Sequence, residues 1–278
     1  MSATTASGST RPNDRGAVHG RVYLVGAGPG DPGLLTLRAA NLLRSCDIVF
    51  HDHLVAEAVL DHVGPEAVRI DVGKVGHGPS SAQTGIDDSL IRAARAGLRV
   101  VRLKGGDPYL YGRGGEEALA LADAGVPFEV VPGVSALSAV PASAGIPLTH
   151  RGVATSVGVI AGACAGDGGV PAALGGAAQA DTVVAFMGLA NLGGLVQALL
   201  AAGRNADTPA AAIASGTTRV AATVIGTLGG IDADVRRAGL RAPVLIVVGD
   251  VVRLRERLAG GAASAAPNRE RILQECMN

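Results

Sequence analysis

The sequence predicts an α/β protein with two α/β domains, a mainly parallel sheet in the first and a mixed sheet in the second. Two observations carry this prediction. Short apolar runs alternate with helical spacing through the first half, as is typical of parallel strands joined by crossover helices. In the second half, two strand-like runs are separated by only a few residues, and so short a link requires an antiparallel pair.

Five strands are expected in the first half, each a short apolar run that ends at a polar or glycine-rich segment. Helical spacing of apolar residues predicts three helices between them. A small-residue helix is expected after Ser135, whose side chain can cap the first turn. The predicted strands are 22–26, 47–52, 68–73, 100–105 and 128–133, and the helices are 34–43, 86–96 and 115–124.

Five further strands are expected at 156–161, 182–187, 210–214, 219–227 and 243–249, with 210–214 and 219–227 as the antiparallel pair. We place the boundary between the domains after residue 133, so that the first spans 19–133 and the second 134–258. Residues 1–18 are rich in Ser and Thr and predict a disordered tail, and 259–278 predict a flexible one.

Composition excludes several classes of protein. Lys plus Arg equals Asp plus Glu, at 24 each, so no net charge favours nucleic acid or an anionic membrane. No apolar stretch approaches the roughly 20 residues that span a bilayer, and residues 1–18 lack the apolar core of a signal peptide. Cys46, Cys164 and Cys276 lack metal-ligand spacing. We therefore expect a cytoplasmic protein without a metal site.

A glycine-rich loop follows the first predicted strand, in the segment GAGPGDP at residues 26–32. It fails the dinucleotide-binding pattern, because Asp31 stands where that pattern needs its third glycine. It is not a Walker loop, since no Gly-Lys-Ser/Thr follows. Two interpretations remain, a tight turn that Asp31 caps and a ligand crevice at the end of a strand.

The segment LKGGDPYLYGRGGEE at residues 103–117 is the second candidate. Gly105 and Gly106 remove side chains at a strand end, so that a ligand can touch the backbone there. Asp107 adds a carboxylate before a proline-fixed turn, and Arg113 stands at the start of the next helix. A turn alone explains GGDP, but it explains the whole stretch poorly.

The third candidate is VVPGVSALSAVPASAGIPLTHRG at residues 130–152, which ends in the polar pair His150 and Arg151. A surface loop explains His150 as well as function does. Together the three segments resemble the uroporphyrinogen-III C-methyltransferases of the tetrapyrrole methylase family. The resemblance runs from about Val22 to Val252 and also includes FMGL, GTT and PVLIVVGDVV. Its selective part is the joint presence of RLKGGDP, YGRGGEE and GIPLTHRG.

The resemblance implies methylation of uroporphyrinogen III at ring carbons 2 and 7 with S-adenosyl-L-methionine, giving precorrin-2 through precorrin-1 for sirohaem or cobalamin. It also implies S-adenosyl-L-homocysteine as the second product, a homodimer and a cofactor cleft between the two domains. The positions that match the family's cofactor contacts are Pro29, Gly105, Gly106, Asp107, Leu110, Ser135, Ala136, Met187 and Gly216.

The family's general base matches Asp52 and its proton donor matches Lys74, both at predicted strand ends. The family commonly has a Tyr before this Asp and an Arg after it, whereas this chain has His51 and His53, which affects the local substrate contacts. The substrate carries eight carboxylates, which need cations, and Arg binds a carboxylate with two parallel hydrogen bonds. From residue type and position we expect this role for Arg113, Arg151, His77 and His150, with Lys74 nearby.

Two other interpretations stay open from the residues alone. A related methylase that acts on a later precorrin would share the fold, the cofactor and most of the cleft. A non-catalytic cofactor-binding relative would explain the changed neighbours of Asp52, although the presence of both Asp52 and Lys74 argues against it.

Overall fold

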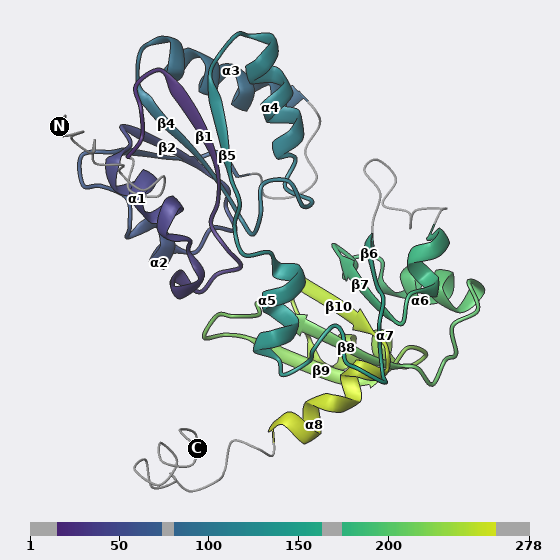
Figure 1. The fold of residues 1–278 in the computed structure, drawn as a ribbon. Coiled ribbons are helices and arrows are strands. Elements are labelled where there is room, and N and C mark those ends of the chain that lie inside the picture. Colours follow the sequence, from purple (N-terminus) through teal and green to yellow (C-terminus); the bar gives the residue numbers. More distant parts are fainter. Residues whose placement is uncertain (1–15, 74–80, 163–173, 260–278) are drawn as a thin grey trace, which may run out of the picture.

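The computed structural model describes residues 16–73, 81–162 and 174–259, and in these ranges the chain forms two α/β domains, each with its own sheet (Figure 1). The first sheet contains β1 (Arg21–Gly26), β2 (Ile48–His51), β3 (Val68–Asp71), β4 (Arg99–Lys104) and β5 (Phe128–Val131). Its strands lie in the order β3-β2-β4-β1-β5, and all its pairings are parallel. The parallel first sheet is therefore confirmed.

Helices cover both faces of this sheet because alternate strand residues point to opposite sides. On β1, Tyr23 and Val25 pack with α1 (Leu37–Ser45) and α2 (Glu57–Leu60). Val22 and Leu24 pack with α3 (Ser81–Arg95) and α4 (Gly114–Asp123) on the other side. The burial of both faces explains why β1 is a nearly continuous apolar run.

The first long helix starts later than residue 34, where the apolar spacing predicts it. Residues Pro32–Leu34 form a short 3-10 turn, η2, in which the Asp31 carboxylate accepts from the Gly33 N–H at 2.8 Å. The helix α1 then begins at Leu37, because the Thr36 hydroxyl accepts from the Ala39 N–H at 3.1 Å and caps the first turn.

The second sheet contains β6 (Val157–Ala161), β7 (Thr182–Phe186), β8 (Pro209–Ala214), β9 (Ala222–Thr227) and β10 (Val244–Val248). Its order is β6-β7-β10-β8-β9, with β6 parallel to β7 and the other pairs antiparallel. The predicted mixed sheet and the antiparallel pair β8–β9 are confirmed. The remaining elements are α5 (Ala136–Ser143), η3 (Gly175–Gln179), α6 (Leu192–Ala201), α7 (Ile231–Ala238), η4 (Asp250–Arg253) and α8 (Leu254–Ala259).

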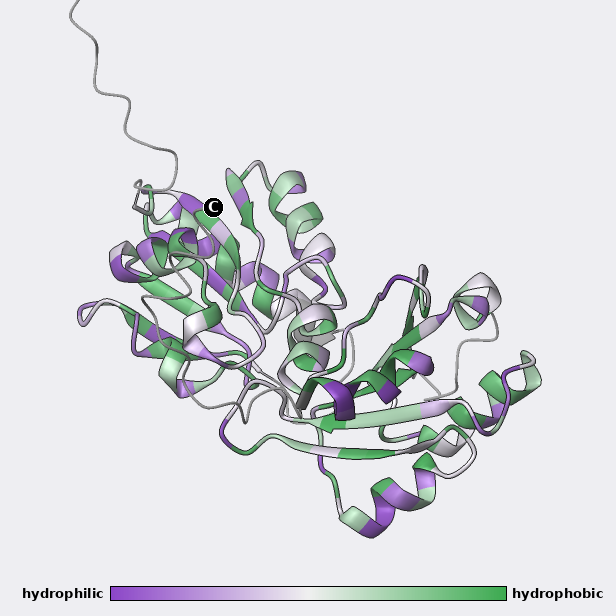
Figure 2. Ribbon diagram, turned by 60° about the horizontal axis from the view of Figure 1, so that its bottom comes forward, coloured by the Kyte–Doolittle hydropathy of each residue, from purple (hydrophilic) through white to green (hydrophobic). Residues whose placement is uncertain are grey.

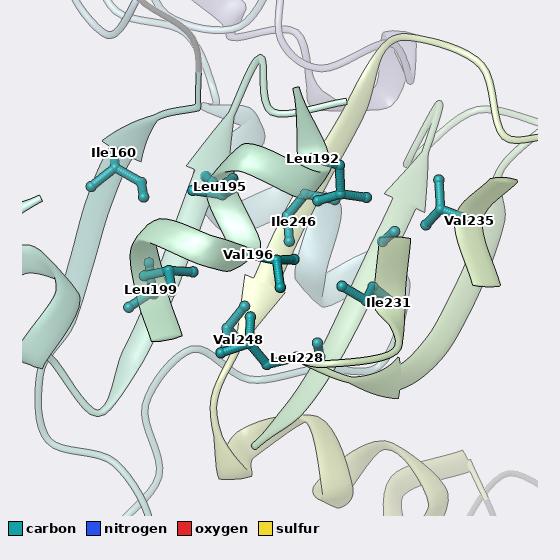
Figure 3. Close-up of a cluster of buried hydrophobic side chains, with 14 of the residues drawn as sticks. Ile160, Leu192, Leu195, Val196, Leu199, Leu228, Ile231, Val235, Ile246 and Val248 are labelled. Carbon is teal, nitrogen blue, oxygen red and sulfur yellow. The ribbon is translucent and has the colours of Figure 1, made fainter. Parts of the chain in front are cut away.

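The second sheet also has a core on each face. Ile246 and Val248 of β10 pack with Leu195 and Leu199 of α6 (Figure 3), and α7 completes that layer. On the opposite face, alternate β10 residues pack against α5, which connects the two domains in Figure 1. Hydrophobic residues run along the strands of both sheets, and hydrophilic ones gather on helices and loops (Figure 2). No helix in the described part of the chain combines the length and the apolar character needed to cross a membrane.

Three glycines pack against one another where β1, β4 and β5 end. A Cβ added to Gly26 would lie 2.5 Å from the Gly133 Cα and 2.6 Å from the Gly106 carbonyl oxygen. A Cβ added to Gly133 would lie 2.2 Å from the same oxygen. Because these neighbours are backbone atoms and cannot turn aside, only glycine lets the three strand ends converge.

The Gly133→Ala substitution tests this close packing. We expect a loss of about 1–3 kcal/mol of stability, because the new methyl group forces the strand ends apart. The control is Gly115→Ala in α4, where the added Cβ meets nothing within 4 Å and removing a helical glycine stabilises by up to about 1 kcal/mol. The urea concentration at the unfolding midpoint measures the stability of each variant. Equal midpoints for the two variants would contradict the packing argument.

Candidate active site

The glycine-rich loops after β1 and β4 pair with each other through their backbones. The Gly106 N–H donates to the Gly28 carbonyl at 2.8 Å, and the Gly28 N–H donates to the Gly106 carbonyl at 3.2 Å. Gly28 and Gly106 have φ values of 75° and 64°, which glycine adopts without strain. Half-buried Pro29 follows directly. The first two candidate segments of the sequence therefore form one backbone surface.

Asp107 ties this surface to the end of β5. One carboxylate oxygen accepts from the Tyr109 N–H at 2.9 Å, and the other accepts from the Gly133 N–H at 3.0 Å. The turn continues as the Leu110 N–H donates to the Asp107 carbonyl at 3.4 Å. Gly105 is exposed, and a Cβ placed there would meet nothing within 4 Å. Protein packing therefore does not require a glycine at 105, and the space beside it is open.

The second domain contributes the other predicted cofactor residues. Ser135 caps α5 by accepting from the Leu137 N–H at 3.1 Å, and Ala136 is the first residue of that helix. Met187 follows β7 with 51% of its surface exposed. Gly216 follows β8 and is buried against α5, where an added Cβ would lie 2.6 Å from a Val140 methyl carbon.

Direct contacts join the two domains beside these residues. The Asp31 N–H donates to the Thr217 hydroxyl at 3.2 Å. The rings of Tyr111 and Phe186 lie 5.0 Å apart between centroids, with a 45° tilt. Loops after β1 and β4 thus touch segments after β8 and at the end of β7, which brings the first-domain and second-domain candidates into one region.

A pocket of about 630 Å³ lies between the domains in this region. It contains none of the nine predicted cofactor residues, but it borders them, since Val134 precedes Ser135 and Thr217 follows Gly216. Its lining residues are Asp31, Leu34, Val134, Ser138, Ala139, Ala142, Ser143, Thr217, Thr218 and Ala221.

Backbone strain is concentrated in the same loops. Among the described residues, the non-glycine residues with positive φ are Tyr111, Arg113, Met187, Ser215 and Thr217. All five belong to the loops that follow β4, β7 and β8. Side-chain-bearing residues adopt this conformation only at a cost, and such residues cluster at functional sites. Their common location supports these loops as the candidate functional end of the molecule.

Asp52 lies directly after β2, at the carboxyl edge of the first sheet. Its backbone N–H donates to the Leu103 carbonyl at 3.2 Å, and its side chain is 31% exposed. The carboxylate forms an ion pair with buried Arg102 of β4. The neighbouring His51 ring contacts the Asp52 carbonyl at 3.2 Å, and His53 contacts the Asp71 carboxylate at 3.2 Å.

Sequence reasoning missed the buried charges behind Asp52. Arg102 and Lys104 of β4 both contact the carboxylate of Glu117 of α4 at 2.9 Å. Burial, followed by the Arg102 cation, lowers the pKa of Lys104 below its ordinary value. Burial also acts to lower the pKa of Arg102, but the carboxylates of Asp52 and Glu117 outweigh it and hold that pKa above its ordinary value. The available signal was two charges inside the otherwise apolar strand VVRLKG.

The predicted substrate residues are not brought together. Arg113 is exposed at the N-terminus of α4 and pairs with Glu116 at 2.6 Å, which raises the pKa of the arginine. Arg151 and His150 are exposed in the turn before β6, and His150 pairs with Ala154 through its backbone.

This turn lies at the amino end of β6 and its parallel neighbour β7, whereas Met187 follows the carboxyl end of β7. The five residues of β7 span roughly 16 Å at 3.3 Å per residue, so the structure separates His150 and Arg151 from Met187 by that length. Lys74 and His77 lie outside the described residues.

Known proteins resemble this chain along most of its length. It is 46% identical over 264 residues to a uroporphyrinogen-III C-methyltransferase of a Sinorhizobium species, covering 92% of this chain and 94% of that protein. A crystal structure of the uroporphyrin-III C-methyl transferase from Thermus thermophilus, complexed with S-adenyl homocysteine, superposes with a TM-score of 0.73. That pair is 42% identical and covers 84% of this chain and 99% of the other.

The chain is also 47% identical over 252 residues to a siroheme synthase of Stutzerimonas stutzeri, covering 90% of this chain but 54% of that protein. It therefore spans about half the length of the siroheme synthases it matches. The sequence model of the Tetrapyrrole (Corrin/Porphyrin) Methylases matches residues 21–232, well over half of the chain. With the paired glycine loops and the two joined sheets, this match establishes that the chain belongs to the tetrapyrrole (corrin/porphyrin) methylase family.

Proposed function

We propose that this chain is a uroporphyrinogen-III C-methyltransferase, which moves methyl groups from S-adenosyl-L-methionine to ring carbons 2 and 7 of uroporphyrinogen III and forms precorrin-2 through precorrin-1. The likeness to the Sinorhizobium methyltransferase along nearly the whole of both chains carries the proposal. The likeness to siroheme synthases supports a place in sirohaem formation, with cobalamin formation as the other use of the product.

The residues present fit such a methyl donor. The open space beside Gly105 and the paired backbones of Gly28 and Gly106 provide room and polar groups without side chains. Half-exposed Met187 offers a polarisable thioether to a sulfonium. When bound, S-adenosyl-L-methionine supplies a methyl group activated by the positive charge on its sulfur. We assign its binding to Pro29, Gly105, Gly106, Asp107, Leu110, Ser135, Ala136, Met187 and Gly216.

The carboxylate of Asp52 is the proposed general base. A pyrrole carbon that accepts a methyl group leaves its ring cationic, and the ring then loses a proton. A partly exposed carboxylate at the carboxyl end of β2 can stabilise that cation and accept the proton on an oxygen atom. Lys74 is the proposed proton donor. The loops from both domains align the ring carbon and exclude water, which lowers the barrier to a transfer between two bound molecules.

We assign the carboxylates of the substrate to Arg113, Arg151, His77 and His150. Arg113 has the best support, because it lies in the loop after β4 and its strained backbone presents an exposed guanidinium. To bind the substrate, the Arg113 guanidinium has to exchange its ion pair with Glu116 for one with a substrate carboxylate. The proposals for His150 and Arg151 rest on residue type and position in the sequence, a cytoplasmic location rests on composition, and a homodimer rests on the family resemblance.

Incubation of the purified chain with uroporphyrinogen III and isotope-labelled S-adenosyl-L-methionine tests the activity directly. We expect a product heavier by two methyl groups, a singly methylated intermediate at early times, and formation of S-adenosyl-L-homocysteine. Mass spectrometry and absorbance measure all three. Omission of the tetrapyrrole is the control. If uroporphyrinogen III is not labelled but a more highly methylated precorrin is, the proposed substrate is wrong and the later precorrin takes its place.

A Gly105→Val substitution tests the cofactor site. We expect an affinity for S-adenosyl-L-homocysteine weaker by about tenfold or more, because the branched side chain occupies the open space. We expect little change in melting temperature, since a Cβ there meets no protein atom within 4 Å. Isothermal titration calorimetry measures the affinity. Gly176→Val is the matched control, because a Cβ there also meets nothing within 4 Å. Unchanged affinity in the Gly105 variant would remove this loop from the site.

A further inference from the structure

Three buried charged residues lie behind the carboxyl end of the first sheet. The side chains of Arg102, Lys104 and Glu117 are 3%, 2% and 0% exposed, in a sheet otherwise packed with apolar residues. Removing such charges from water costs several kcal/mol for each ion, and a buried ion pair is weak evidence for stability. These three residues form the Arg102–Lys104–Glu117 cluster, and its cost in free energy points to a role other than stability.

The cluster fixes the Arg102 guanidinium in one orientation. Its Nε donates to Glu117 Oε1 at 2.9 Å, and Lys104 Nζ donates to the same oxygen at 2.9 Å. Its Nη1 donates to the Leu103 carbonyl at 3.2 Å and lies 3.5 Å from the Phe50 carbonyl. Three groups on three elements thus hold the planar fork, so that little freedom remains for Nη2.

The remaining nitrogen, Nη2, donates to the Asp52 carboxylate. Asp52 is also held through its backbone, which bonds to Leu103 on the strand that carries Arg102. Its side chain nevertheless keeps 31% exposure, so the carboxylate is fixed on one side and reachable from the other. Precise orientation of a reacting group is worth a large part of a catalytic barrier.

We propose that Arg102 is a positioning residue for the Asp52 carboxylate, and that Glu117 and Lys104 serve to hold Arg102 in place. The proposal rests on the function proposed above, because it assumes that Asp52 acts on the substrate. It predicts that Arg102 affects catalysis only through Asp52. A general base positioned in this way contributes roughly 10²–10⁴-fold to the rate, and misplacement forfeits part of that factor.

A second Arg–Asp pair joins the same two strands at their other end and supplies a matched control. Arg99 at the start of β4 bonds to Asp47, just before β2, at 2.5 and 3.0 Å. The Arg99 hydrogen bond lowers the pKa of Asp47 to about 2. This pair crosses from β4 to β2 as Arg102–Asp52 does, but it lies at the amino ends of the strands, away from the loops of the candidate site.

Charged groups lie around Asp52 on several sides. Arg102 faces it from β4, Lys104 and Glu117 lie behind Arg102, and His51 contacts its carbonyl. On the outer side, His53 pairs with Asp71 of β3. Arg102 donates to the Asp52 carboxylate itself, so we expect removal of Arg102 to release that carboxylate from its fixed orientation.

The experiment compares Arg102→Met, Arg102→Lys and Arg99→Met in the full chain. For Arg102→Met we expect kcat to fall roughly 10- to 100-fold and the KM for S-adenosyl-L-methionine to stay within about twofold. Arg102→Lys keeps a cation but loses the planar fork, so its kcat is intermediate. Arg99→Met leaves kcat unchanged.

A double-mutant cycle with Asp52→Asn completes the test. If Arg102 acts through Asp52, the double variant Arg102→Met/Asp52→Asn is no slower than Asp52→Asn alone. Additive losses, or an equal fall in kcat for Arg99→Met, would overturn the positioning role. If Arg102→Met does not fold, which circular dichroism reveals, the same cycle is run with Arg102→Lys and decides by the same additivity.

Failure of the proposed function gives a different pattern. A wild-type chain that does not methylate uroporphyrinogen III removes that function, and full activity of Asp52→Asn removes the base assignment and this proposal with it. Loss of activity in Asp52→Asn together with wild-type kcat in Arg102→Met overturns the positioning role alone.

Discussion

Backbone contact among Gly26, Gly106 and Gly133 is the constraint on which the candidate site depends. No Cβ fits between these strand ends, so β1, β4 and β5 converge more closely than side chains would allow. The loops that follow therefore leave the sheet from a single place. Their backbone N–H groups donate to backbone carbonyls, as between Gly28 and Gly106, or to the carboxylate of Asp107, as from Gly133. Buried backbone groups are satisfied in this way without filling the space above the loops.

The same sheet carries a local exception to its apolar interior. Parallel strands buried on both faces favour Val, Ile and Leu, and Val100, Val101 and Leu103 of β4 follow that rule. Arg102 and Lys104 break it near the carboxyl end, where α4 supplies Glu117 as a common partner. These two charged residues lie near Asp52, and the other interior residues of β4 are apolar. A group of charges that contributes little net stability is understandable where it fixes a carboxylate at the edge of an open site.

Most strands were predictable because they are short apolar runs that end at polar or glycine-rich segments, and all ten were found within a few residues of their predicted limits. The helix α6 was not predicted, because its sequence, LGGLVQALLA, is apolar almost throughout and shows no polar face. The candidate loops followed from their glycines. The pairing of Arg102 with Glu117 could not be predicted from the sequence. Glu116 and Glu117 are adjacent, and only the rotation of α4 about its axis decides which of them is buried. That pairing spans 15 residues and depends on how the helix crosses the sheet.

The residues with strained backbone and the contacts between the two domains lie in the same loops. The loops after β4, β7 and β8 have to reach across from two separate sheets, and they hold Tyr111, Met187 and Thr217 at positive φ. Tyr111 packs on Phe186, and Thr217 accepts from the Asp31 N–H, so two of the five described non-glycine residues with positive φ take part in a contact that joins the domains. The contacts offset the conformational cost of the loops. The candidate site therefore lies where loops of the two domains meet, and Asp52 lies at the carboxyl edge of the first sheet.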